Sequence, residues 1–183
     1  MQWTLDTTHA EVEFAVKHLM ISTVKGRFKT FTGSGRTADD GRLEAVQMSI
    51  DTASVDTNVQ QRDDHLRSPD FFDAANHPEM TFQSTKVTQA GSDVMIVGDL
   101  TIRGVTKPVT LTGEYIAPSK DPWGNSRAAL AVGAKINRKD WGLGWNMALE
   151  AGGVVVSDEV KLRVEVEAVA QAAAAAELAV AAG

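Results

Sequence analysis

Apolar and polar residues alternate with a period of two along most of this chain, and this alternation constrains the fold more than any other feature. Residues 160–167 are the clearest case, because four apolar residues alternate there with two basic and two acidic residues. Successive side chains of a strand point to opposite faces, so such a segment has one apolar face and one polar face. The same pattern recurs at residues 12–16, 46–50, 80–82, 94–102, 109–115 and 130–136. The sequence therefore predicts a sheet that is buried on one side only.

Short turn signals separate the predicted strands. They are the Asp-Asp-Gly of residues 39–41, the Ala-Gly-Ser-Asp of residues 90–93, and residues 118–124, which begin with proline and end with glycine. Many strands joined by short turns favour closure into a barrel, which leaves no exposed sheet edge. We predict an all-β, antiparallel barrel.

Residues 60–67 break the alternation. This segment is polar and lacks β-branched residues, so it is predicted to form a short helix that Pro69 ends. Phe71 and Phe72 follow the proline and must be buried. We therefore expect the helix to lie across one barrel mouth, with these two rings as a plug.

The C-terminal residues 168–183 have a different composition. Their alanine run favours helix but offers little surface to bury. We predict one domain, residues 1–169, followed by an alanine-rich tail, residues 170–183, which is partly helical or frayed and carries no chemistry.

Composition excludes several classes of function. The chain contains no cysteine, which excludes disulfides, thiolate metal sites and cysteine nucleophiles. The formal net charge is -6 and basic residues do not cluster, so we expect no nucleic-acid partner. No run approaches the ~18 apolar residues of a membrane-spanning helix. The four histidines are not spaced as metal ligands, and we expect no metal site.

The first six residues lack the basic and apolar regions of a secretory signal. We expect a cytoplasmic location for the chain as given, and a periplasmic one for a chain from which a signal peptide has been removed.

Several short motifs occur together in a fixed order. They are residues 3–6 with His9, residues 14–19, 26–28, 54–57, 62–66 and 70–73, Pro78, and residues 82–84, 98–109 and 136–142. With these motifs the chain resembles the YceI-like family of polyisoprenoid-binding proteins over roughly residues 2–169. It differs from many relatives in the missing signal peptide and in the alanine-rich tail.

The resemblance implies an eight-stranded, lipocalin-like barrel with a long tunnel for a polyprenyl chain or an isoprenoid quinone tail, and in many members a homodimer. An eight-stranded barrel is wide enough to hold one slender ligand. We expect binding without catalysis and without a cofactor, and we expect Gly98 and Ala134 to leave room on the inward faces. The candidate ligand-binding residues are Phe14, Val16, His18, Phe28, Met48, Ile50, Phe72, Phe82, Ile96, Leu100, Leu111, Ile136, Arg138, Trp141 and Trp145.

Two polar candidates continue inward faces near strand ends. His18 follows the face of residues 12–16, and Arg138 follows the face of residues 130–136. A charge inside a barrel must be paired or hydrated. One interpretation is contact with a ligand head group, such as a diphosphate or a quinone carbonyl. The other is an ion pair that closes the barrel end, with three candidate partners: Asp63, Asp73 and Asp140.

Two further functions remain open from the sequence. Arg62, Asp63 and His65 on the predicted helix could serve acid–base chemistry on a hydrophobic substrate, although such a charged run is more often a solvated or capping face. Alternatively, a filled barrel docks a protein partner and has no cavity.

Two loops also have open interpretations. Arg103 precedes Gly104 and is interpreted as a turn residue, with head-group contact as the alternative. The apolar segment 141–147 is interpreted as a lid on the core, with a lipid portal and a dimer contact as alternatives.

Overall fold

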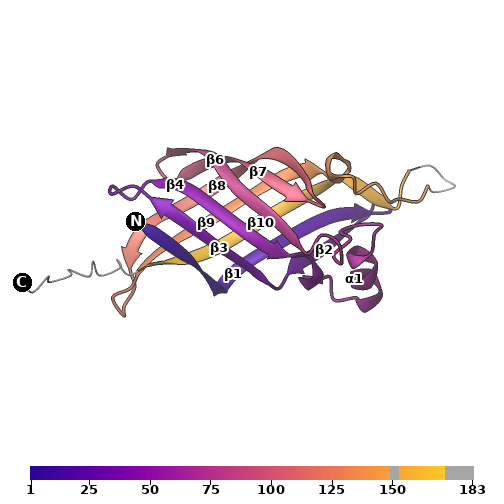
Figure 1. The fold of residues 1–183 in the computed structure, drawn as a ribbon. Coiled ribbons are helices and arrows are strands. Elements are labelled where there is room, and N and C mark those ends of the chain that lie inside the picture. The colour runs from indigo at the N-terminus through magenta and orange to yellow at the C-terminus, as the bar shows by residue number, and fades with distance from the viewer. Residues whose placement is uncertain (149–152, 172–183) are drawn as a thin grey trace, which may run out of the picture.

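The computed structural model describes residues 1–148 and 153–171, which form a closed antiparallel barrel with eight strand positions (Figure 1). The strands are β1 (Gln2–His18), β2 (Ser22–Phe28), β3 (Phe31–Thr37), β4 (Leu43–Asp51), β5 (Val55–Asp56), β6 (Glu79–Ala90), β7 (Asp93–Ile102), β8 (Val105–Lys120), β9 (Ser126–Asn137) and β10 (Val156–Ala170). The predicted fold class is therefore confirmed.

Pairing between β10 and β1 closes the barrel. On its other side β1 pairs with β3 near its start and with β2 near its end, so β2 and β3 together fill one strand position. The short β5 follows β4, separated from it by the 3-10 turn η1 (Thr52–Ser54), and pairs with β2. Because β4 pairs with β3 and β5 pairs with β2, β4 and β5 also share one position. Ten strands therefore occupy eight positions.

The two ends of the barrel are built differently (Figure 1). The helix α1 (Gln60–Arg67) lies at one end, together with the β1–β2 turn and the loop between β9 and β10; we call this the helical end. The N-terminus lies at the opposite end, where the Gln171 amide donates to the Gln2 carbonyl; we call this the terminal end. In residues 1–148 and 153–171, no helix is long and apolar enough to cross a bilayer.

The structure contains the predicted helix, but its last strand extends into the segment predicted as a tail. The helix occupies residues 60–67 as predicted, and Ser68 caps its C-terminus just before Pro69. In contrast, residues 168–170 are not part of a helical or frayed tail, because β10 continues through Ala170 in register with Trp3. The rest of the predicted tail, residues 172–183, lies outside the described residues.

The sequence pattern did not predict β2 and β3. The strand β3 contains Gly33, Ser34 and Gly35, so it lacks the β-branched residues and the clear alternation that mark a strand. Its place in the sheet is set by its neighbours, since it pairs with β4 from Phe31 to Thr37 and with the start of β1.

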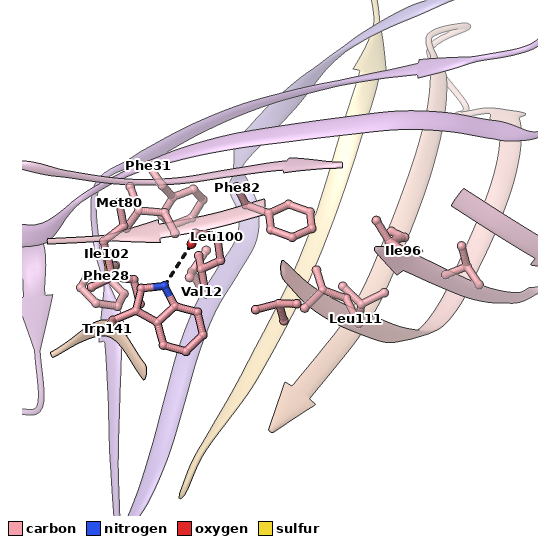
Figure 2. Packing of buried hydrophobic residues seen from close by; sticks show 14 of the residues in the cluster. Val12, Phe28, Phe31, Met80, Phe82, Ile96, Leu100, Ile102, Leu111 and Trp141 are labelled. Atoms are coloured by element: carbon pink, nitrogen blue, oxygen red, sulfur yellow. Dashed lines mark hydrogen bonds between the residues drawn. The ribbon is translucent and has the colours of Figure 1, made fainter. Parts of the chain in front are cut away.

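The buried apolar side chains form one cluster along the barrel interior, and Figure 2 shows part of it around Phe82, Leu100 and Trp141. Trp141 comes from the 3-10 turn η2 (Arg138–Trp141), and its indole Nε1 donates to the Leu100 carbonyl at 3.0 Å. Leu143 is buried beside it. Segment 141–147 therefore begins as a lid, in agreement with the first interpretation, whereas Met147 at its end is exposed.

Candidate functional site

A cavity of about 580 Å³ runs through the barrel interior. Its lining reaches Trp3, Thr37 and Tyr115 at the terminal end, and Arg62 and His65 of α1 at the helical end. This volume falls within the roughly 300–1,000 Å³ of typical small-molecule sites. The filled-barrel alternative predicted no cavity, so this part of it is wrong.

Apolar side chains make up nearly all of the wall. They come from the inward faces of β1, β4, β6, β8, β9 and β10, and include Val12, Val46, Met80, Val109, Leu130, Val132, Leu162 and Val164. Several of these inward residues, such as Leu162 and Val164, are only half-buried although they point into a closed barrel. They retain accessible surface because they face the hollow and not other side chains.

Most of the predicted ligand-binding residues line this cavity. They are Phe14, Val16, His18, Phe28, Met48, Ile50, Phe72, Phe82, Leu100, Leu111, Ile136, Arg138 and Trp145. Ile96 and Trp141 are not among the lining residues. Ile96 is 0% exposed within the core, and Trp141 is held against the Leu100 backbone, so neither side chain presents surface to the hollow.

Two glycines leave space for aromatic rings that pack directly against their backbone. A Cβ on Gly98 would collide with the Phe82 ring and approach the Gln83 carbonyl to 2.6 Å. A Cβ on Gly26 would lie 2.6 Å from Cε1 of Phe14. The prediction that Gly98 leaves room for a ligand is therefore wrong: the Phe82 ring fills that space. Ala134, the other predicted spacer, packs against the core and is not a lining residue.

Hydrogen bonds to Thr57 fix the start of α1. Asp63 is buried, and its Oδ1 accepts from the Thr57 amide at 2.8 Å and from the Thr57 hydroxyl at 2.6 Å. Arg62 donates from Nε to the same hydroxyl and from a terminal nitrogen to the Thr57 carbonyl. These bonds hold the helix over the barrel mouth, which agrees with the capping interpretation.

An aromatic cluster continues the cover. The His65 ring packs edge-on against Phe71 and Trp145, with centroids 5.1 and 4.7 Å apart, and its Nε2 lies 2.8 Å from Oδ2 of Asp70. Phe72 packs edge-on against Phe28 at 5.5 Å. Both phenylalanines that follow Pro69 thus close the mouth as predicted.

Arg138 fastens the loop between β9 and β10. It is 5% exposed, and its guanidinium donates to the carbonyls of Ser157, Leu143 and Trp145. Asp158 lies 3.5 Å away, so the partners predicted for Arg138, namely Asp63, Asp73 and Asp140, are wrong. Burial lowers the pKa of Arg138 from its ordinary value, with Asp158 acting in the opposite direction.

The three side chains considered for acid–base chemistry are not assembled into one site. Arg62 and His65 reach the cavity, but the Asp63 carboxylate faces Thr57 and is not a lining residue. The His65 ring is paired with Asp70. Arg103 has a φ of 51° and occupies the β7–β8 turn, as the turn interpretation predicted.

Bonds among the strands close the terminal end. The Trp3 indole donates to the Thr37 hydroxyl at 3.0 Å, and the Tyr115 hydroxyl donates to the Gly41 carbonyl. Arg127 donates to the carboxylates of Asp6, Asp121 and Glu167. Hydrogen bonds from Asn125 and Arg127 lower the pKa of Asp121 to about 2.

Asp6, His9 and Glu167 bring possible metal-ligand atoms within 4.8 Å of one another. The Arg127 guanidinium already donates to both of these carboxylates, so it neutralises much of the charge that would attract a metal cation.

Trp3, Leu5, Leu43 and Phe71 also line the cavity, although they were not among the predicted ligand-binding residues. Leu43 is the first residue of β4, where no alternation precedes it. Trp3 and Leu5 alternate with polar residues at the start of β1, a signal that could have placed them on the inward face. Phe71 was predicted as a plug, and the structure adds that it borders the cavity.

Comparison with known proteins places this architecture in a family. The profile of the YceI-like domain matches residues 3–168. Protein YceI of Escherichia coli is 45% identical over 165 residues, which cover 89% of this chain and 83% of that protein. Among solved structures, a YCEI protein of Campylobacter jejuni is 32% identical, has a TM-score of 0.75, and covers 85% of this chain and 90% of its own.

A second solved structure is more distant. It is described as a polyisoprenoid-binding domain from Saccharophagus degradans, and it is 18% identical with a TM-score of 0.67 over 92% of this chain and 98% of its own. Its likeness concerns the fold. Because the profile covers almost the whole barrel and a relative shares 45% of its residues, this chain belongs to the YceI-like domain family.

Proposed function

We propose that this protein binds one long isoprenoid lipid inside the barrel, either a polyprenyl chain or the tail of an isoprenoid quinone, and acts as its carrier, store or sensor. It does so without catalysis and without a cofactor. The observation that carries the proposal is the continuous cavity, whose wall is mostly apolar along the length of the barrel.

The energetics favour a slender hydrocarbon ligand. Burial of apolar surface contributes about 25 cal/mol per Å² removed from water, less the cost of ordering the chain. The walls offer few polar groups that such a ligand would leave unpaired, because Trp3, Thr37 and Tyr115 bond to the protein itself. The polyisoprenoid-binding description of the Saccharophagus degradans relative supports an isoprenoid over other hydrocarbons.

The polar group of the ligand is assigned to the helical end. His18 lines the cavity there beside Arg62, which bonds to Thr57, whereas Trp3, Thr37 and Tyr115 at the terminal end all have partners. Within the described residues, the His18 ring makes no hydrogen bond. Its imidazole is therefore free to meet a diphosphate oxygen or a quinone carbonyl.

Organic extraction of the purified protein, followed by mass spectrometry and paired with a native mass, tests the proposal. The expected result is a stoichiometric isoprenoid that is released on denaturation. A clean apo mass, with no uptake of added polyprenyl diphosphate or ubiquinone, would overturn it.

A pair of variants separates binding in the cavity from adsorption to the surface. Val164→Phe adds a ring on the inward face, and we expect it to lose the extracted lipid. Met95→Phe adds the same ring on the outward face and should keep it, because Met95 is exposed. Circular dichroism confirms that both variants are folded.

A further inference from the structure

The turn between β1 and β2 exposes apolar side chains at the helical end. Met20 is 63% exposed and Ile21 is 83% exposed, and Leu19 beside them is also exposed. Met147 of the neighbouring loop is exposed as well. We call these four residues the apolar tip. Exposed apolar side chains that gather in one place indicate a contact surface more strongly than single ones do.

The backbone of this turn is strained, which the fold alone does not explain. Leu19 and Met20 have φ values of 52° and 61°, and the Ile21 amide donates to the His18 carbonyl. Leu19 and Met20 are thus the central residues of a β-turn from His18 to Ile21, inside a three-residue hairpin loop, and both have positive φ. Asn-Gly is the preferred sequence at two such central positions. Leucine and methionine are unfavourable here, so their side chains need another reason to occupy the turn.

The tip is attached directly to the mouth of the cavity. His18, the last residue before the turn, lines the cavity, and so does Val155. The Leu19 amide donates to the Val155 carbonyl at 2.8 Å, and the Val155 amide donates to the Met147 carbonyl at 3.1 Å. A surface that holds this tip would therefore lie at the opening through which an apolar ligand must pass.

Three lysines that form no ion pair within residues 1–148 and 153–171 lie on the outer face just behind the tip. Lys25 and Lys161 flank Ala15 on neighbouring strands, and Lys17 follows two residues along β1. All three are exposed. The lysine ion pairs in the described residues involve Lys29, Lys135 and Lys139 instead.

The carboxylates around these lysines have basic neighbours of their own. Glu13, two residues before Ala15 on β1, lies opposite Arg27 and Arg163 on the neighbouring strands. Asp158 is paired with Arg138 and Lys139, and Glu159 is paired with Lys135. The region is thus basic although the whole chain carries a net charge of -6.

We propose that the apolar tip inserts into the surface of an anionic lipid bilayer while Lys17, Lys25 and Lys161 face its head groups, so that the cavity opens toward the membrane. Apolar side chains in front of a basic patch match the layers of a bilayer interface. A stable contact with a second protein needs about 800 Å² on each partner, which a projecting turn with one neighbouring side chain does not supply. This inference extends the proposed function, since a lipid ligand is the reason for an opening toward a membrane.

Flotation of the full chain with vesicles tests the inference. The probe is a vesicle of phosphatidylethanolamine and phosphatidylglycerol, compared with one of phosphatidylcholine alone. We expect the wild-type protein to float with the anionic vesicles, and we expect added salt to weaken this binding. Absence of flotation with anionic vesicles would overturn the proposal.

The tip variant is Leu19→Asn/Met20→Gly/Ile21→Thr. It removes the apolar side chains and installs the preferred turn sequence, so its melting temperature should not fall. We expect it to bind anionic vesicles at least about tenfold more weakly than the wild-type protein. Trp123→Ser is the matched control: Trp123 is 81% exposed in the turn between β8 and β9, and its loss should leave flotation unchanged.

The charge variant Lys17→Gln/Lys25→Gln/Lys161→Gln should lose most of the preference for anionic over phosphatidylcholine vesicles. Unchanged flotation of the tip variant, or loss of flotation in Trp123→Ser, would contradict the proposal. So would a tip variant that changes the native mass of the assembly in solution, because the tip would then be a contact between copies. Uptake of farnesol without vesicles reports on the cavity separately, so failure of the membrane contact and failure of the proposed function are distinguishable.

Discussion

The two ends of the barrel are closed by different kinds of interaction. At the terminal end the strands bond to one another through Arg127, Trp3 and Tyr115. At the helical end the cover consists of α1 and the loop between β9 and β10, which do not belong to the barrel sheet. Hydrogen bonds from Arg138 and the edge-on packing of His65 against Trp145 hold this cover in place. Contacts between barrel strands break only when the barrel unfolds, whereas a cover can open locally. We therefore expect the ligand to exchange through the helical end.

The largest expected effect is that of Arg138→Met. This substitution removes the donor of three carbonyls in a buried place and leaves them without partners. We expect the free energy of unfolding to fall by about 3–5 kcal/mol, measured by urea denaturation. The cover should also loosen. Relative to the wild-type protein, hydrogen exchange should then become faster in residues 143–147, with little change in the strands of the terminal end.

Arg163→Met is the control for this substitution. Arg163 is exposed and pairs with Glu165 on the same strand. Its loss should change stability by less than about 1 kcal/mol. Equal losses for the two arginines would show that Arg138 is not the fastening of the cover.

A smaller effect is expected from Trp3→Phe at the terminal end. The substitution keeps an aromatic ring but removes the indole donor of the Thr37 hydroxyl in a buried site. We expect a loss of about 1–3 kcal/mol in urea denaturation. The rate of ligand release should not change, because this end stays shut. Faster release after Trp3→Phe would break the distinction between the two ends.

The sequence predicted the barrel because alternation survives wherever a strand has a dry inward face and a wet outward face. It failed at β3, where Gly33, Ser34 and Gly35 leave no alternation to read. It also failed at the end of β10, since Ala168 and Ala170 have little strand propensity and are held there by pairing with β1. Pairing partners far apart in the chain decide such segments, and a single sequence does not contain them.

The cavity was predictable in its composition but less so in its detail. Inward phase correctly placed Phe14, Met48 and Ile136 on the wall. The alternation shows which face a side chain is on but not whether its neighbours cover it. Ile96 was therefore predicted on the cavity wall, although it is fully buried. The partners of Arg138 were also unpredictable, because they are carbonyls of a loop with no regular pattern.

Trp145→Ala tests the helical end directly. Trp145 is half-buried and packs against His65 and Phe71, so its loss should reduce stability by only about 1–2 kcal/mol. Because the ring is part of the cover, we expect release of a preloaded labelled polyprenol to become about tenfold faster, given that 1.4 kcal/mol corresponds to a factor of ten. A chase with unlabelled polyprenol measures the rate. Release that stays at the wild-type rate would mean that the ligand leaves by another route.

The smallest expected effect is a pH dependence at the terminal end. The folded pKa of Asp121 is about 2, held down by bonds from Asn125 and Arg127, whereas an unfolded aspartate titrates near ~3.9. Between these values the unfolded chain binds more protons, so the stabilisation is present above about pH 4 and is lost as pH falls toward about 2. Asp121→Asn should therefore flatten the dependence of the urea midpoint on pH in this window. Asp93→Asn, at the exposed start of β7 at the same end, should not, because Asp93 makes no side-chain bond within the described residues. If both substitutions flatten it equally, the acid sensitivity comes from net charge, and the bonds around Arg127 do not distinguish this end from the other.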